Sequence, residues 1–128
     1  MPVFKEGAPT LPTSDHERAK KFYGETLGFE EEEDTPGGTM YKVGTSHVFV
    51  YPSQFAGTNQ ATAATFLVDD IESAVAELKG KGVTFEEYDF PGLKTENGLA
   101  AIGSWKAAWF KDSEGNILSI TEQVPPAS

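Results

Sequence analysis

Apolar and polar positions along the chain form two similar series, each with one helix and several short strands. In the first series the stretch "SDHERAKKFYGETLGF" repeats apolar residues at helical spacing, and Ala19, Phe22, Tyr23 and Leu27 share one face. Three strand-like runs follow, "FEEEE", "TMYKVG" and "HVFVYP", separated by the turn-forming "DTPGG" and "GTS". We therefore predict the order strand, helix and three strands for the first part of the chain.

The second series repeats this order. Its helical stripe consists of Ile71, Ala74, Val75 and Leu78, and strands are predicted at "VTFEEYDF", "KAAWFKD" and "NILSITE". Residues 91–104, "PGLKTENGLAAIGS", contain three glycines and few large apolar groups. We interpret them as a loop, either a mobile flap over a ligand or an inert surface segment.

An internal repeat relates the two series. The stretch "APTLPTSDHERAKKF" from Ala8 aligns without a gap on "AATFLVDDIESAVAE" from Ala63, an offset of 55 residues. Each copy contains a capping box of the form S/D-x-x-E, which predicts helix N-caps at Ser14 and Asp69. Neither half can cover its own sheet, so we predict one α+β domain.

The predicted domain consists of two tandem βαβββ modules that form one pseudo-symmetric body, with a concave mixed sheet inside and the helices outside. Module one spans residues 1–51, a linker spans 52–61, and module two spans 62–128. The length of 128 residues fits this single domain.

Composition excludes several classes of function. Twenty acidic and ten basic residues give a net charge of −10. This charge argues against binding of nucleic acid and favours cationic or neutral partners. No apolar run approaches the ~20 residues of a membrane span, and "MPVFKEGAPT" lacks the features of a secretory signal, so we expect a cytoplasmic protein with no membrane partner. The absence of cysteine excludes disulfides, thiolate metal sites and a cysteine nucleophile. The acidic run at residues 29–35 is interpreted as a solvated strand end or loop without a catalytic role.

Three stretches carry a resemblance to a known family. "SDHERAKKFYGETLGF", "VDDIESAVAELKGKGV" and "AWFKDSEGNILSI" follow one another in the order found in the vicinal oxygen chelate superfamily, which the chain resembles. That superfamily includes glyoxalase I, extradiol dioxygenases, fosfomycin resistance enzymes and bleomycin-binding proteins. The resemblance implies the fold predicted above and a homodimer.

The resemblance also implies where a metal ion would be held. Metal-using members carry ligands on the first strand of each module and on the last strand, and these positions correspond here to Ala8, Ala63 and Ser119. The remaining position, on the fourth strand, corresponds to Phe49, or to His47 if the register shifts by two. Alanine and serine cannot replace carboxylate and imidazole ligands. We therefore expect no metal and no cofactor.

Aromatic and polar residues at inward positions are the candidates for ligand binding. Strand alternation places His47, Phe49 and Tyr51 on one face. Trp105 and Trp109 either form an aromatic wall for a planar ligand or pack in the core. His16, in the first helical turn, is expected to be exposed to solvent. The full predicted set is His47, Phe49, Tyr51, Trp105, Trp109 and Ser119.

Three hypotheses of function follow. The first is a metal-independent protein similar to the bleomycin-resistance type, which sequesters a cationic or aromatic small molecule. The alternative is a glyoxalase-like lyase or isomerase that uses His47, Tyr51 or Glu6 as its acid or base. The third is a protein whose cleft is filled by its own side chains and which works through a partner.

Overall fold

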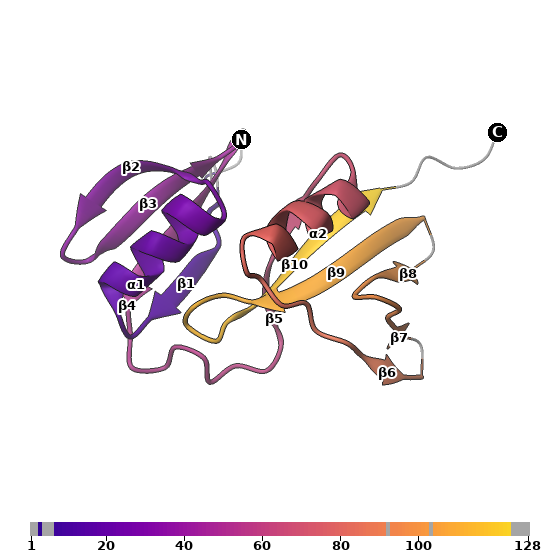
Figure 1. The fold of residues 1–128 in the computed structure, drawn as a ribbon. Coiled ribbons are helices and arrows are strands. Elements are labelled where there is room, and N and C mark those ends of the chain that lie inside the picture. The colour runs from indigo at the N-terminus through magenta and orange to yellow at the C-terminus, as the bar shows by residue number, and fades with distance from the viewer. Residues whose placement is uncertain (1–2, 4–6, 92, 103, 124–128) are drawn as a thin grey trace. The chain divides into compact units, whose positions relative to one another are not determined.

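The computed structural model describes residues 3, 7–91, 93–102 and 104–123 (Figure 1). Within them two four-stranded sheets are formed. In each sheet the first strand of the module lies at one edge beside the last strand, and the two strands that precede the last one in the chain follow in reverse order. The strand orders are β1-β4-β3-β2 and β5-β10-β9-β8. This repetition confirms the α+β class and the tandem βαβββ modules predicted from the sequence.

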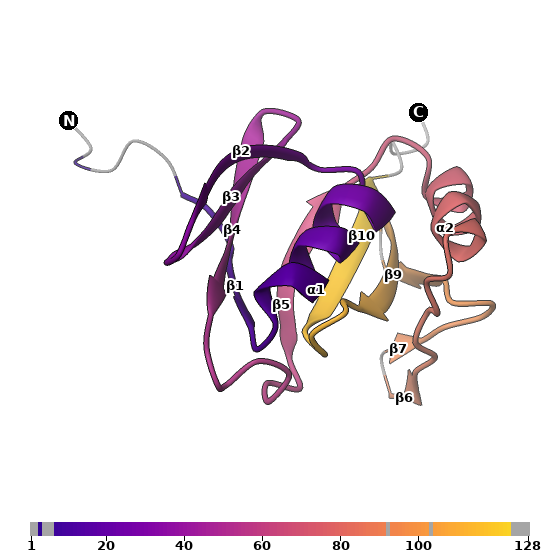
Figure 2. The same cartoon turned by 60° about the vertical axis from the view of Figure 1, so that its left-hand side comes forward.

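The first sheet is mixed. Its elements are β1 (Thr10–Thr13), α1 (His16–Lys20), the π-helical turn η1 (Lys21–Thr26), β2 (Glu30–Thr35), β3 (Gly38–Val43) and β4 (Ser46–Pro52). β1 pairs with β4 in parallel, whereas β4 with β3 and β3 with β2 are antiparallel. The helix lies along one face of this sheet (Figures 1 and 2).

Alternate residues of the first sheet face α1 and form its core. Leu11, Tyr41, Val48 and Val50 are at most 1% exposed, and Tyr23 from η1 packs on Tyr41 with ring centroids 5.8 Å apart. Burial of each aliphatic side chain stabilises the fold by ~1.5–3 kcal/mol. Because strand side chains alternate, the intervening residues occupy the opposite face, which we call the open face of the first sheet.

The second sheet belongs to the second module. Its elements are β5 (Thr62–Leu67), α2 (Ile71–Gly80), β6 (Asp89–Phe90), β7 (Leu93–Lys94), β8 (Ala100–Ile102), β9 (Trp105–Lys111) and β10 (Ile117–Gln123). β6 and β7 form a separate two-stranded pair. The helix α2 buries Ile71, Val75 and Leu78, which are residues of the predicted stripe.

The edge strand of the second sheet differs from the prediction. The predicted strand at residues 83–90 is wrong over most of its length, because only Asp89–Phe90 is a strand and Phe85 makes an isolated bridge to Phe110. The edge is β8 instead, which lies in the predicted loop 91–104. Two segments pair with the outer edge of the long strand β9. Glu86 donates its N–H to the carbonyl oxygen of Trp109 at 2.8 Å, and β8 pairs with the other end of the strand.

Both helix N-caps lie one residue after the predicted positions. The carboxylate of Asp15 accepts the N–H of Arg18 at 3.1 Å, and that of Asp70 accepts the N–H of Ser73 at 3.2 Å. Both aspartates have the extended backbone that an N-cap requires. They are also equivalent in the repeat, so the capping motif was identified correctly but placed one residue early.

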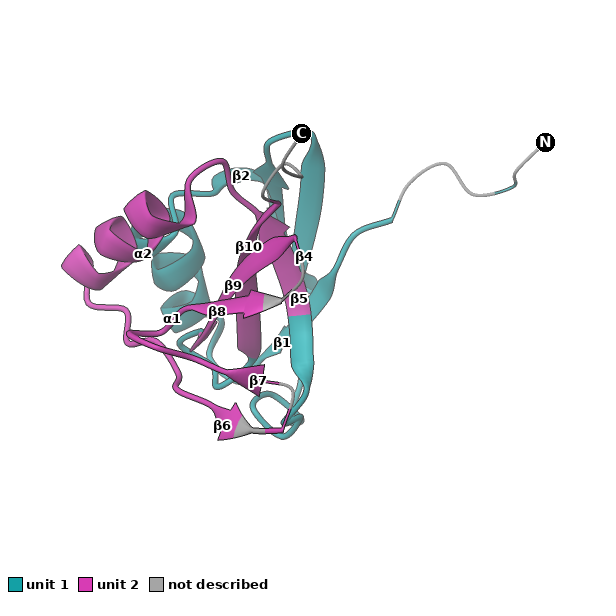
Figure 3. Ribbon diagram, turned by 90° about the vertical axis from the view of Figure 1, so that its right-hand side faces the viewer, with its two compact units in different colours: residues 1–63, 112–116 teal, residues 64–111, 117–128 magenta. Residues whose placement is uncertain are grey.

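The chain divides into two compact units (Figure 3). Unit 1 contains Met1–Ala63 and Asp112–Asn116, and unit 2 contains Ala64–Lys111 and Ile117–Ser128. The turn between β9 and β10 therefore belongs to unit 1, although both strands belong to unit 2. Among the helices of the described ranges, none is both long and apolar enough to cross a membrane.

Candidate functional site

The open face of the first sheet contains three of the predicted ligand-binding residues. On β4, Val48 and Val50 are buried toward α1, while His47, Phe49 and Tyr51 are partly exposed on the other side. The Phe49 and Tyr51 rings are nearly parallel, at 3°, with centroids 6.4 Å apart. The alternation predicted from the sequence is thus present, and it forms an aromatic surface on β4.

A glycine allows the Phe49 ring to lie close to the backbone. Gly38, at the start of β3, has a φ of +143°, which side-chain-bearing residues rarely adopt. A Cβ atom there would lie 2.5 Å from Cζ of Phe49 and 2.7 Å from the carbonyl oxygen of Val50. The absence of a side chain at Gly38 therefore leaves the space that the Phe49 ring occupies.

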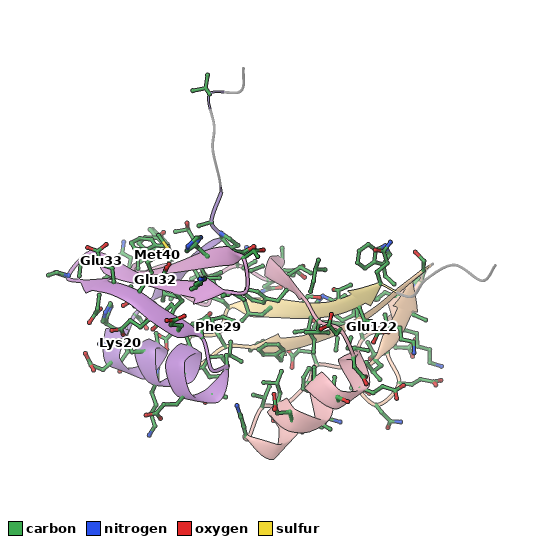
Figure 4. All side chains as sticks on the ribbon, turned by 90° about the horizontal axis from the view of Figure 1, so that it is seen from above. Lys20, Phe29, Glu32, Glu33, Met40 and Glu122 are labelled. Carbon is green, nitrogen blue, oxygen red and sulfur yellow. The ribbon has the colours of Figure 1, made fainter. Side chains whose placement is uncertain are left out.

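A β-bulge in β2 sorts the acidic run onto two faces. Glu31 is opposite Tyr41 and Glu33 is opposite Met40, so Glu32 is the additional residue of the bulge. Figure 4 shows Glu32, Glu33 and Met40 on the side of the sheet away from α1. Two consecutive glutamates thus occupy the open face, which simple alternation does not predict.

The helix side of the same run is neutralised. Lys20 lies 2.7 Å from Asp34 and 3.7 Å from Glu31 (Figure 4 labels Lys20). Hydrogen bonds from Lys20 and His16, in that order of effect, hold the pKa of Asp34 well below its usual range. These acidic residues are structural.

Glu32 and His47 meet on the open face. Oε1 of Glu32 lies 3.1 Å from Nε2 of His47, and the two side chains are about one third exposed, at 37% and 29%. They line a cavity of about 350 Å³ together with Gly7, Ala8 and Met40. The acidic run was expected to have no catalytic role, and the bulge that places Glu32 here has no clear signature in the sequence.

The other three predicted residues lie on the second sheet. In the antiparallel pairing of β9 and β10, Ser119 is opposite Trp109 and Gln123 is opposite Trp105. The alternate residues of these strands face α2, as shown by Lys106 reaching Glu72 at 4.0 Å. Trp105, Trp109 and Ser119 therefore share the face away from α2, which answers the question of orientation that the sequence left open for Trp109.

Two of the three residues on this second face already contact other side chains of the protein. Trp109 packs edge-to-face on Tyr88 with centroids 5.5 Å apart, and the Ser119 hydroxyl lies 3.3 Å from that of Thr121. Ser119 is only 3% exposed, whereas Trp105 is 37% exposed. Of the three, Trp105 is the most accessible to a ligand.

The positions implied for metal ligands do not fit a metal ion. Ala8, Ala63 and Phe49 have no side-chain donor atom, and the Ser119 hydroxyl is a weak neutral ligand already close to Thr121. Among the described residues, no group of three or more His, Asp or Glu side chains is arranged to hold a metal ion. The pair of Glu32 and His47 supplies two donors only.

A second histidine cluster resembles a catalytic triad in composition but not in geometry. His16, expected to be exposed, is 26% exposed and contacts Asp34 at 3.0 Å and the hydroxyl of Thr39 at 3.1 Å. Both contacts use Nε2, whereas a nucleophile–histidine–carboxylate relay needs the carboxylate and the hydroxyl on opposite ring nitrogens. This cluster is therefore structural. Glu6, a further acid–base candidate beside His47 and Tyr51, lies outside the described residues.

Comparison with known proteins gives one family. The family described as Glyoxalase/Bleomycin resistance protein/Dioxygenase superfamily matches residues 7–120. No curated protein matches the chain.

Several solved structures share the fold. A glyoxalase family protein from Enterococcus faecalis is 22% identical, with a TM-score of 0.67 over 94% of this chain and 98% of that chain. TnmS3, an antibiotic binding protein from Streptomyces sp. CB03234, is 22% identical, with a TM-score of 0.66 over 96% and 98%. A glyoxalase/bleomycin resistance protein/dioxygenase from Alicyclobacillus acidocaldarius is 15% identical, with a TM-score of 0.70 over 94% and 92%. At these identities the likeness concerns the fold alone.

Proposed function

We propose that this chain, which belongs to the Glyoxalase/Bleomycin resistance protein/Dioxygenase superfamily, binds a cationic or aromatic small molecule without using a metal ion. The observation that carries the proposal is the open face of the first sheet. There the parallel rings of Phe49 and Tyr51 continue, along β4, into the cavity lined by His47 and Glu32.

The chemistry of this face suits an aromatic ligand. Aromatic rings provide large apolar contact areas with few rotatable bonds, and their faces attract cations. Met40, the register partner of Phe49, adds a polarisable side chain that adapts to ligand shape. The net charge of −10 favours a cationic ligand through long-range attraction. The antibiotic binding protein TnmS3, with its similar fold, supports the choice of a small-molecule ligand.

Metal independence is proposed from the donor set. Residues without donor atoms occupy the positions that the resemblance assigns to metal ligands, as described above. We also propose that the chain forms a homodimer, as the resemblance implies.

The proposal is tested by a binding screen on wild-type protein and the variant Phe49→Ala. A panel of cationic and neutral aromatic compounds is titrated by calorimetry, and we expect a hit whose affinity falls at least tenfold in Phe49→Ala, since tenfold corresponds to about 1.4 kcal/mol. Phe55→Ala is the matched control, because Phe55 is 66% exposed in the segment that follows β4. In the same preparation, elemental analysis and titration with Ni, Zn, Mn and Fe ions are expected to show no stoichiometric binding.

Three results would contradict the proposal. A panel without any hit, or a hit bound equally well by Phe49→Ala, would show that the open face of the first sheet does not bind the ligand as proposed. Tight stoichiometric metal binding would contradict metal independence and favour the hypothesis of a metal-dependent enzyme.

A second candidate, a lyase or isomerase, is favoured by the contact between His47 and Glu32. A carboxylate beside an imidazole is a common arrangement for moving protons. This candidate predicts that His47→Gln loses any turnover found for the protein, and unchanged turnover would exclude His47 as its acid or base.

A further inference from the structure

The cavity at the open face of the first sheet combines one carboxylate with an apolar lining. Ala8 contributes a methyl group and Met40 a thioether, and Glu32 and His47 supply the polar groups. It is a shallow pocket, widely open to solvent, and its volume of about 350 Å³ lies at the lower end of the range of small-molecule sites. A cavity of this composition accepts a group that is apolar over most of its surface and polar at one end.

The carboxylate has binding capacity beyond its contact with His47. A carboxylate has two oxygens and about four acceptor positions, and the single ring nitrogen of His47 that lies 3.1 Å from Oε1 of Glu32 can fill only one of them. Among the described residues no lysine or arginine pairs with Glu32, in contrast to Glu31 and Asp34 on the helix side, which Lys20 neutralises. A carboxylate without a lysine or arginine partner repels anions and favours a cationic donor.

We infer that Glu32 is the residue that recognises the charge of the ligand, and that the ligand carries a protonated amine attached to an aromatic or apolar body. The ammonium group donates to the Glu32 carboxylate while the body of the ligand packs on Met40 and Phe49. Charge-assisted hydrogen bonds of this kind are about twice as strong as neutral ones. This inference rests on the proposed function, because it assigns the ligand class of the same face.

The experiment uses three probes with the same ring and different charge: 2-phenylethylamine, 2-phenylethanol and 3-phenylpropanoate. Each is titrated into the full-length ¹⁵N-labelled protein, and affinities are measured from amide shifts. For the wild type we expect the amine to bind at least tenfold more tightly than the alcohol, and the carboxylate to bind most weakly.

Two isosteric variants separate local recognition from general charge. Glu32→Gln is expected to remove the preference for the amine and leave binding of the alcohol unchanged. Glu33→Gln is the matched control, because Glu33 is the next residue on the same strand and face but does not line the cavity. It removes the same charge and is expected to retain at least half of the preference.

The outcomes distinguish this inference from the proposed function. Equal binding of the amine and the alcohol, or equal losses in Glu32→Gln and Glu33→Gln, would overturn the role of Glu32, while loss of all binding in Phe49→Ala would still support the ligand face. If no probe shifts the amides of β3 and β4, both fail. Unperturbed amide spectra of both variants are the control for folding.

Discussion

Among the residues of unit 1 that the structure describes, Glu114, in the turn Asp112–Asn116, has a dense set of hydrogen bonds. Its side chain is fully buried, and its carboxylate accepts hydrogen bonds from Thr13 at 2.8 Å, Arg18 at 2.7 and 2.9 Å and Ser113 at 2.8 Å. A buried charge is costly unless it is paired and hydrogen-bonded, and here both conditions are met. Burial raises the pKa of Glu114, but the hydrogen bonds from Arg18 and Thr13 lower it by more than burial raises it. The net effect is a fall of the pKa from 4.5 to about 2.

This pKa predicts how stability depends on pH. Because the folded pKa lies below the unfolded one, the contribution of Glu114 is complete above pH ~4.5 and is lost as the pH falls toward 2. Glu114→Gln is expected to reduce the free energy of unfolding by about 2 kcal/mol at neutral pH, because charged hydrogen bonds contribute ~1.5–3 kcal/mol. Urea denaturation of wild type and variant between pH 7 and 2 should give curves that converge at low pH. Curves that stay parallel throughout would contradict this assignment.

At the scale of elements, the first sheet depends on the tight turn into β3. The hydroxyl of Thr35 accepts the N–H of Gly37 at 3.2 Å and donates to the carbonyl of Gly38 at 3.0 Å, so the side chain bridges the turn. Gly38 then passes directly beneath Phe49. The turn therefore determines both the pairing of β2 with β3 and the position of an aromatic ring on the open face.

Gly38→Ala tests this coupling. The added Cβ has the strained φ and the close contacts described above, so we expect a loss of about 1–3 kcal/mol in the free energy of unfolding. We also expect weaker binding of any ligand that contacts Phe49. Gly37→Ala is the neighbouring control, because its Cβ would meet nothing closer than the Thr35 hydroxyl at 3.7 Å. Similar stability of the two variants in thermal denaturation would show that Phe49 moves without cost.

At the scale of the whole molecule, the chain passes between its two units three times. The passages follow Ala63, Lys111 and Asn116, so a turn of unit 1 is covalently inserted between two strands of unit 2. Within unit 1 this turn is held by Glu114, by the Tyr23 hydroxyl that donates to Asp112, and by Asn116, which donates to the carbonyl of Pro12 at 2.9 Å. Because of this covalent insertion, unfolding of one unit releases the ends of the chain segments that belong to the other unit.

We therefore propose that residues 1–128 unfold as one domain. Differential scanning calorimetry should give a single transition with equal calorimetric and van't Hoff enthalpies, which is the test for two-state behaviour. Two resolved transitions would instead show that the units unfold independently.

The sequence by itself determined the order of the elements in the first module, the repeat and the faces of β4. These features depend on local periodicity: residues such as Val48 and Phe49 alternate because strand geometry has a period of two. The repeat also identified the equivalent helix starts, although local capping rules placed each N-cap one residue early.

Only the tertiary structure decided the features that depend on pairing between distant residues. β8, rather than residues 83–90, became the edge strand because β9 divides its hydrogen bonds between two segments. Glu32 came to His47 because a bulge in β2 is defined by its register against β3, and Trp109 received its face from the register of β9 against β10. A change of one residue in register moves a side chain to the other face of a sheet, and that register is a property of two strands together, so the sequence of either strand alone does not specify it.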